Sequence, residues 1–188
     1  DALINRIIFK TLHGIGINVD IERKHIDAIK DLAVSKENGK RINLPLGVTV
    51  HKEYDYLTLV CKKIERPEFF VEFKCGTITV PEFGKINIKR VNDFTQKPNV
   101  LYIDYKKLPK GAVWRYRKEG DIIEKFGGGT KKLKSFLIDK KIPQRERDFI
   151  PVLAYGNEVY AVAGVEISNK VKLDNATKSA IKIEVEKK

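Results

Sequence analysis

Arginine and lysine side chains gather in three short segments between residues 113 and 147, and such gatherings are typical of phosphate binding. The first segment is Trp114-Arg115-Tyr116-Arg117. In a strand its side chains would alternate between two faces, so we expect Arg115 and Arg117 to face solvent while both aromatic rings pack in the core. A solvent-facing guanidinium can bind a phosphate through two hydrogen bonds. The alternative, an exposed Trp114–Tyr116 platform on which bases stack, stays open.

The second segment is the glycine-rich run that begins at Gly127. We expect one helix from Thr130 to about Asp139, with Thr130 as its N-cap residue. Open backbone amides and the positive end of the helix dipole would favour an anion at that helix start. A flexible loop followed by a solvated helix face is an equally good interpretation. Three lysines follow the glycines: Lys131, Lys132 and Lys134.

The third segment, from Lys140 to Asp148, is interrupted by Pro143. Because proline limits helix continuation, we expect a turn on which basic side chains converge. Glu146 and Asp148 could instead neutralise Arg147 locally. The basic side chains of this turn are Lys140, Lys141, Arg145 and Arg147. The three segments together predict a polyanion-binding surface.

The net charge of the chain supports the same interpretation. It holds 37 basic and 25 acidic residues, which gives +12, and residues 108–150 alone hold 12 basic and 6 acidic residues. Half of the excess therefore lies in under a quarter of the chain. Lysines that merely keep a protein in solution would not need to cluster, so we favour nucleic acid as the partner. A membrane surface is disfavoured, because no charged segment also carries a long apolar helical face.

Motifs for catalysis or metal binding are absent from the sequence. Gly129-Thr130-Lys131 does not fit the order of a phosphate-binding P-loop. Cys61 and Cys75 lack the companions that a zinc site needs, and we expect free thiols in a reducing cytosol. The histidines are not at helical metal-binding spacing: His13, His25 and His51. The sequence therefore predicts no catalytic residue and no metal site in this chain.

Two amphipathic helices and a series of strands must position the basic segments. Apolar residues three and four apart between Leu3 and Leu12 predict one helix, and Asp20 is a plausible N-cap for a second. After residue 38 the apolar period changes to two, which indicates strands. We therefore expect an α+β chain in three parts: a helical hairpin over residues 1–38, a β-rich linker region over 39–107, and a β-rich domain with one helix over 108–188.

The motifs of residues 108–168 resemble the C-terminal domain of bacterial tRNA(Ile)-lysidine synthases, and residues 1–60 resemble the helical and linker region of the same enzymes. Glu119 departs from the pattern, which has proline before the Gly-Asp turn. The matching motifs are Arg115-Tyr116-Arg117-x-x-Gly120-Asp121, Gly129-x-Lys131-Lys132-Leu133-Lys134, Lys141-Ile142-Pro143, Arg147, Ile150-Pro151-Val152-Leu153 and, upstream, Asp20-Ile21-Glu22-Arg23-x-His25-Ile26 and Gly39-Lys40-x-x-Asn43-Leu44-Pro45-x-Gly47.

The resemblance implies a cytoplasmic ligase that uses ATP to attach lysine to the wobble cytidine of an isoleucine tRNA. It assigns ATP, Mg and catalysis to an N-terminal domain with a Ser-Gly-Gly-x-Asp-Ser loop, which this sequence lacks. With no initiator Met, the chain is expected to be the non-catalytic portion that holds the acceptor-stem side of the tRNA. The expected partners are tRNA, the N-terminal catalytic domain and, as a possibility, a second copy.

The resemblance also assigns the basic positions. It implies tRNA contacts for Arg115, Arg117, Lys131, Lys132, Lys141 and Arg147, whereas Lys134, Lys140 and Arg145 are added from charge alone. A second hypothesis makes the chain an interface module that packs on its catalytic domain and binds no RNA. Its sign would be an exposed apolar patch on the first two helices. An independent small-molecule enzyme is a third hypothesis, which the absence of an acid–base or metal cluster disfavours.

Overall fold

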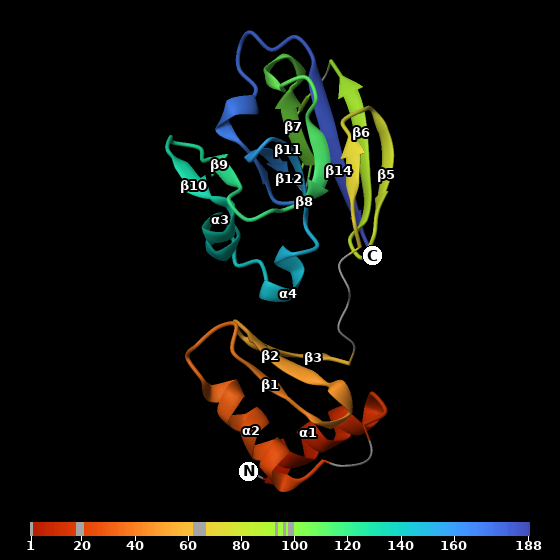
Figure 1. The fold of residues 1–188 in the computed structure, drawn as a ribbon, viewed down its shortest axis with the longest axis vertical. Helices are drawn as coiled ribbons and strands as arrows, with labels where there is room; N and C mark the ends of the chain where they lie inside the picture. Colours follow the sequence, from red (N-terminus) through yellow and green to blue (C-terminus); the bar gives the residue numbers. More distant parts are fainter. Residues whose placement is uncertain (1, 18–20, 62–66, 93, 96, 98–99) are drawn as a thin grey trace. The chain divides into compact units, whose positions relative to one another are not determined.

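The computed structural model describes residues 2–17, 21–61, 67–92, 94–95, 97 and 100–188, without the side chains of residues 144 and 145. The chain divides into two compact units, Asp1–Glu65 and Arg66–Lys188, called unit 1 and unit 2 below (Figure 1). None of the helices formed by the described residues has the length and apolar character needed to cross a membrane.

Unit 1 combines two helices with a small antiparallel sheet. The sheet has the strand order β1-β2-β3. The elements are α1 (Ala2–Gly14), α2 (Arg23–Val34), β1 (Arg41–Asn43), the 3-10 helix η1 (Pro45–Gly47), β2 (Thr49–Glu53) and β3 (Tyr56–Val60). Both predicted helices are therefore present. The strands after them belong to the same unit rather than to a separate linker region.

The core of unit 1 lies between the helices and the sheet. Leu12, Ile29 and Leu32 are buried there against Val48 and Val50. Among the described residues of α1 only Leu12 is buried, so the predicted apolar stripe of this helix is mostly exposed. The predicted N-cap of α2, residue 20, lies outside the described residues.

The structure instead starts α2 after Glu22. The backbone N–H of Glu22 donates a hydrogen bond to Nδ1 of His25 at 3.0 Å, which ties the residue before the helix to its first turn. His25 therefore has a structural role at the helix start.

Unit 2 contains two sheets. The first has the order β5-β6-β14-β7, and the second has the order β10-β9-β12-β11-β8-β4, with β13 also paired to β12. The strands of the first sheet are β5 (Gly76–Val80), β6 (Gly84–Val91), β7 (Val100–Asp104) and β14 (Ala180–Lys187). Those of the second are β4 (Phe70–Glu72), β8 (Val113–Tyr116), β9 (Ile122–Glu124), β10 (Thr130–Lys132), β11 (Pro151–Tyr155), β12 (Glu158–Val162) and β13 (Glu166–Ile167).

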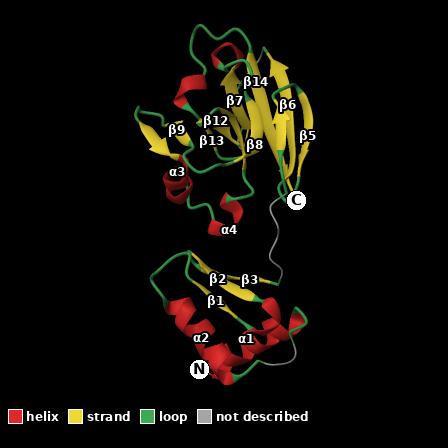
Figure 2. Ribbon diagram, in the orientation of Figure 1, coloured by secondary structure: helices red, strands yellow, loops and turns green. Residues whose placement is uncertain are grey.

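The sheets and helix α3 (Leu133–Asp139) form three layers (Figure 2). Ile86 and Ile183 of the first sheet pack against Trp114 and Leu153 of the second. On its other face the second sheet packs against α3, and Val152 lies in that second core. Successive residues of β11 therefore point into different cores, as alternation in a strand requires. The second sheet is covered on both faces.

The boundary predicted near residue 108 falls inside unit 2. Strand β14, from the end of the chain, pairs with both β6 and β7, and β4 pairs with β8. These pairings join strands from both sides of residue 108 into shared sheets. The predicted α+β class, with mostly strands after residue 40, is confirmed.

The helix predicted from Thr130 starts three residues later than expected. Residues 130–132 form β10, which pairs with β9, and Lys132 occupies the N-cap position of α3. The strand pairing replaces what would have been the first helical turn. Three further short helices are η2 (Tyr105–Lys107), α4 (Gln144–Arg147) and η3 (Asn169–Val171).

Candidate nucleic-acid interface

Arg115 lies in the interior of unit 2. It is 3% exposed, and its guanidinium donates to both carboxylate oxygens of Asp121 at 2.8 and 2.9 Å and to the carbonyls of Tyr116 and Gly156. The prediction that Arg115 faces solvent is wrong. It sits opposite Val152 in the sheet, on the face that α3 covers. The guanidinium of Arg115 therefore holds the chain segments around Asp121 and Gly156 together. Because it is buried, Arg115 is no longer a candidate for contact with RNA.

The aromatic residues beside Arg115 are also buried. Trp114 is 0% exposed and Tyr116 is 3% exposed. The Tyr116 hydroxyl donates to the carbonyl of Pro81 at 2.6 Å. Core packing of both rings is confirmed, and this excludes the alternative of a base-stacking platform on β8.

Arg117 and Arg147 are half-buried and organise the turn that leads into β11. Nε of Arg117 donates to the carbonyl of Arg147 at 3.0 Å, and its terminal nitrogen pairs with Asp148. Nε of Arg147 donates to the carbonyl of Ile142 at 2.7 Å. Asp148 thus pairs with Arg117, not with Arg147 as the local alternative supposed. Both arginines are partly engaged before any ligand arrives.

Two of the candidate lysines are ion-paired. Lys131 pairs with Asp139, and Lys140 pairs with Glu166. The ammonium of Lys140 also lies 5.5 Å from the ring centroid of Phe136. These two lysines add less net positive potential to the surface than unpaired lysines would.

Lys132, Lys134 and Lys141 are exposed, and none of them forms an ion pair with another described residue. We call these three lysines the α3 face. Lys134 lies one helical turn before Ile138, and the Lys141 backbone N–H donates to the carbonyl of Ile138 at 2.9 Å. Lys132 precedes α3, Lys134 lies in its first turn and Lys141 lies two residues beyond its end, and all three side chains are exposed to solvent. The side chain of Arg145, the remaining candidate, lies outside the described residues.

The glycine run forms the loop of the β9–β10 hairpin rather than an anion-binding helix start. Gly127, Gly128 and Gly129 all have positive φ, and the Lys125 N–H donates to the Gly129 carbonyl at 3.1 Å. The backbone N–H of Leu133 donates to the carbonyl of Asp121 at 2.8 Å. The first amide of α3 is therefore already occupied, and the expected helix-start site is wrong.

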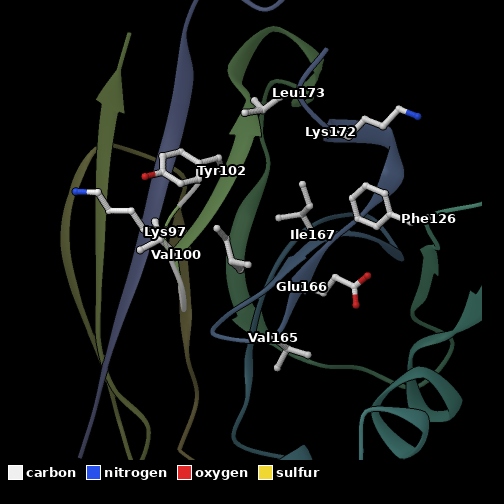
Figure 3. A pocket seen from close by; sticks show the side chains of 10 residues that line it. Lys97, Val100, Tyr102, Phe126, Val165, Glu166, Ile167, Lys172 and Leu173 are labelled. Carbon is white, nitrogen blue, oxygen red and sulfur yellow. The ribbon is translucent and has the colours of Figure 1, made fainter. Parts of the chain in front are cut away.

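A pocket of about 350 Å³ opens elsewhere in unit 2 (Figure 3). Its lining residues come from β7 and the residue 97 before it, from the β9–β10 loop, from the chain around β13, and from the residues after η3. They are Lys97, Val100, Leu101, Tyr102, Phe126, Val165, Glu166, Ile167, Lys172 and Leu173. The lining mixes apolar side chains with two lysines and the carboxylate of Glu166, and none of these described residues is a nucleophile paired with a base.

Metal-binding side chains do not cluster in the part of the chain that the structure describes. No group of three or more His, Cys, Asp or Glu side chains there could hold an ion. Cys61 and Cys75 are both exposed free thiols, and they lie in different units.

Strands β9, β10, β13 and β14 of unit 2, and one surface, were not predicted from the sequence. The longest of these strands is β14, in which Ile181, Ile183 and Val185 alternate with charged residues. The surface is formed by basic and aromatic side chains near the ends of β6 and β7. Sequence patterns do not reveal it, because these side chains come from separate segments that are brought together only in the folded protein.

Comparisons with known proteins decide the family. Residues 112–184 match the family described as TilS substrate C-terminal domain. The tRNA(Ile)-lysidine synthase of Caldanaerobacter subterraneus is 35% identical over 89% of this chain, and that of Clostridium acetobutylicum is 31% identical over 99% of it. The chain belongs to the tRNA(Ile)-lysidine synthase family.

The chain spans 37% of the length of the Caldanaerobacter synthase and 42% of the Clostridium synthase. A solved structure described as a TILS C-terminal domain has the same fold over 64% of this chain and 98% of its own, with a TM-score of 0.56 and 23% sequence identity. The chain thus carries the C-terminal portion of this synthase family, as its motifs predicted.

Proposed function

We propose that this chain is the tRNA-binding, non-catalytic C-terminal portion of a cytoplasmic tRNA(Ile)-lysidine synthase. The whole enzyme would use ATP and Mg, held by an N-terminal domain, to attach lysine to the wobble cytidine of an isoleucine tRNA. Unit 2 would hold the acceptor-stem side of the same molecule. The observation that carries this proposal is the α3 face, where three lysines are exposed without an ion-pair partner among the described residues.

The physical basis of binding is the release of counterions from phosphates. Each phosphate that a lysine neutralises contributes about −0.7 to −0.9 to the slope of log affinity against log salt concentration. The partly engaged Arg117, Lys131, Lys140 and Arg147 would add weaker attraction around the α3 face. Such contacts position a nucleic acid without reading its sequence. Binding the tRNA body at a distance would help to place the anticodon base in a separate active site.

The test reverses the charge of the α3 face by the substitutions Lys132→Glu, Lys134→Glu and Lys141→Glu. The matched control reverses three exposed basic residues of unit 1 by Arg6→Glu, Lys10→Glu and Lys36→Glu. In a fluorescence titration with isoleucine tRNA, the first variant should lose affinity and flatten the salt slope by about two to three. Equal losses in the two variants would show only a general charge effect and would refute the α3 face.

A second function is favoured by one specific observation on α1. Its apolar side chains are largely uncovered: Leu3 is 70% exposed, Ile4 is 49% exposed and Ile7 is 55% exposed. Exposed apolar surface of this kind marks a protein interface. We propose that this surface packs against the catalytic portion of the synthase, since well over half of the length of the relatives lies outside the matched segment. This role is compatible with RNA binding by unit 2.

Calorimetric titration of this chain with a separately expressed catalytic portion tests the interface. The double substitution Ile4→Lys and Ile7→Lys should abolish the heat of binding while leaving the melting temperature of the chain unchanged, because both side chains are exposed. Loss of a concentration-dependent dimer in sedimentation, without any heat of binding to the catalytic portion, would instead assign the α1 surface to a homodimer.

A further inference from the structure

Three side chains from separate segments form a short stack at the ends of β6 and β7. The guanidinium carbon of Arg90 lies 5.0 Å from the ring centroid of Tyr105. The ring centroids of Tyr105 and Phe73 are 6.4 Å apart, and their planes are tilted by 31°. We call Arg90, Tyr105 and Phe73 the stack. Tyr105 is 42% exposed and Arg90 is also exposed, so the stack is accessible to a ligand.

The chain around the stack is held by hydrogen bonds and ion pairs. Nε of Arg90 donates to the hydroxyl of Ser179 at 2.8 Å. The ammonium of Lys107 binds the carboxylate of Asp174 at 2.6 Å, and the hydroxyl of Thr177 donates to Asp104 at 2.8 Å. These contacts join η2 to the loop before β14. They fix the orientation of Tyr105 and Arg90 before binding, which lowers the entropy cost of capturing a ligand.

Three lysines are chain neighbours of the stack residues or of Ser179, to which Arg90 donates a hydrogen bond. Lys74 follows Phe73 in the chain, Lys106 follows Tyr105, and Lys178 precedes the residue that binds Arg90. All three lysines are exposed and form no ion pair with another described residue. The nearby carboxylates of Asp104 and Asp174 are already engaged by Lys107 and by the hydroxyl of Thr177.

We propose that the stack binds the base of an unpaired RNA nucleotide, while the flanking lysines contact the phosphates on either side. Aromatic rings and arginine planes between basic groups are how proteins hold single-stranded nucleic acid, because every base offers a π-face. A base inside an A-form duplex is already stacked on its neighbours, so the ring of Tyr105 would favour single-stranded segments. An acidic protein could bind to the lysines, but its binding would not require the aromatic rings and the guanidinium of the stack.

The inference deepens the proposed function, since it rests on RNA as the ligand, but it concerns a different surface. In Figure 1 the arrowheads of β6 and β7 point to the end of unit 2 away from α3 and α4. The α3 face lies at the end of unit 2 that contains α3. Its lysines could bind the phosphates of either single-stranded or double-stranded RNA. The stack, at the other end, would bind nucleotides that are not base-paired.

Fluorescence anisotropy with two labelled RNAs tests the stack: a single-stranded octa-adenylate and a fully paired, blunt-ended duplex. Tyr105→Leu removes the ring, and Tyr105→Phe keeps it. Tyr56→Leu is the matched control, because Tyr56 is 74% exposed and lies in unit 1. Tyr105→Leu should weaken octa-adenylate binding by about 5- to 100-fold, whereas Tyr105→Phe and Tyr56→Leu should leave it within about twofold. Duplex binding should not respond to any of the three.

Arg90→Lys gives an independent arm, because it keeps the charge but removes the planar guanidinium. It should weaken octa-adenylate binding and leave duplex binding unchanged. The inference is overturned if the unchanged chain does not bind octa-adenylate at low salt, if Tyr105→Leu behaves like Tyr56→Leu, or if both RNAs weaken equally. The α3-face variant is tested by its affinity for tRNA, and the stack variants are tested by their affinity for octa-adenylate. The two experiments can therefore refute one proposal without refuting the other.

Discussion

Arg115 and Arg117 are two residues apart, yet their surroundings give them different roles. Arg115 lies in the middle of β8, where α3 covers the sheet. Its guanidinium forms a bidentate ion pair with the carboxylate of Asp121. Arg117 lies just beyond the end of β8 and remains partly accessible. The same residue type is therefore enclosed in the core at one position and only partly buried at the other.

Removing one partner of the buried pair should be costly. We expect Asp121→Ala to lower the free energy of unfolding by about 3–5 kcal/mol, because it leaves the Arg115 charge buried without a counterion. Asp139→Ala, which removes the partner of Lys131 at a surface pair, should cost only about 0–1 kcal/mol. Urea unfolding measures both values. Equal, small costs would contradict a structural role for Arg115.

Tyr160 should ionise at a higher pH than an ordinary tyrosine side chain. Burial, and secondarily its hydrogen bond to the Glu158 carboxylate at 2.9 Å, raises the pKa of Tyr160 to about 12 from the usual 10.0. Because the folded state favours the neutral phenol, this group stabilises the fold below pH 10.0 and loses that contribution as the pH rises towards about 12. In an ultraviolet absorbance titration, Tyr160→Phe should remove the absorbance change of one phenol that ionises near pH 12.

At the scale of elements, the period of the apolar residues indicated strands after residue 38 and placed the helix predicted from Thr130 only approximately. The alternation of β6, β7, β11 and β12 was readable, because apolar and polar residues take turns along each strand. Thr130 to Lys132 was not readable as a strand, because its extended form comes from pairing with β9. The same pairing shortens α3 and removes the expected helix-start site.

The clustering of basic residues in the candidate site was predictable from the sequence. Which of these side chains are buried or ion-paired was not predictable. Pairings such as Lys140 with Glu166 join residues far apart in the sequence, and no local pattern reports them. Burial of Arg115 depends on which layer covers the second face of its sheet. The stack was missed for a related reason, since Phe73, Arg90 and Tyr105 lie on three different elements or their ends.

The element α3 offers a prediction in which binding should improve. Asp139→Asn removes the partner of Lys131 and keeps the size of the side chain. We expect tighter tRNA binding and a salt slope steeper by about one, because a further ammonium becomes available to a phosphate. Lys131→Ala should cost less affinity than Lys134→Ala, which removes an ammonium that has no ion-pair partner among the described residues. Titrations at several salt concentrations separate these outcomes.

At the scale of the whole molecule, the strand pairings determine which fragments of the chain can fold independently. A fragment of residues 66–188 keeps both sheets of unit 2, and we expect it to unfold cooperatively in calorimetry. A fragment of residues 108–188 loses β4 to β7, so β14 would have neither of its partners β6 and β7. We expect this shorter fragment not to fold. A cooperative transition in the shorter fragment would contradict the division of the chain given by the structure.

The central claim is that unit 2 holds the acceptor-stem side of a tRNA through charge that the fold leaves available. The most direct measurement is a titration of the chain with fluorescent isoleucine tRNA and with a copy trimmed of its acceptor stem, each at two salt concentrations. We expect binding that weakens steeply with salt and weakens again when the acceptor stem is removed. Equal affinity for the two RNAs, or binding of neither at low salt, would contradict it.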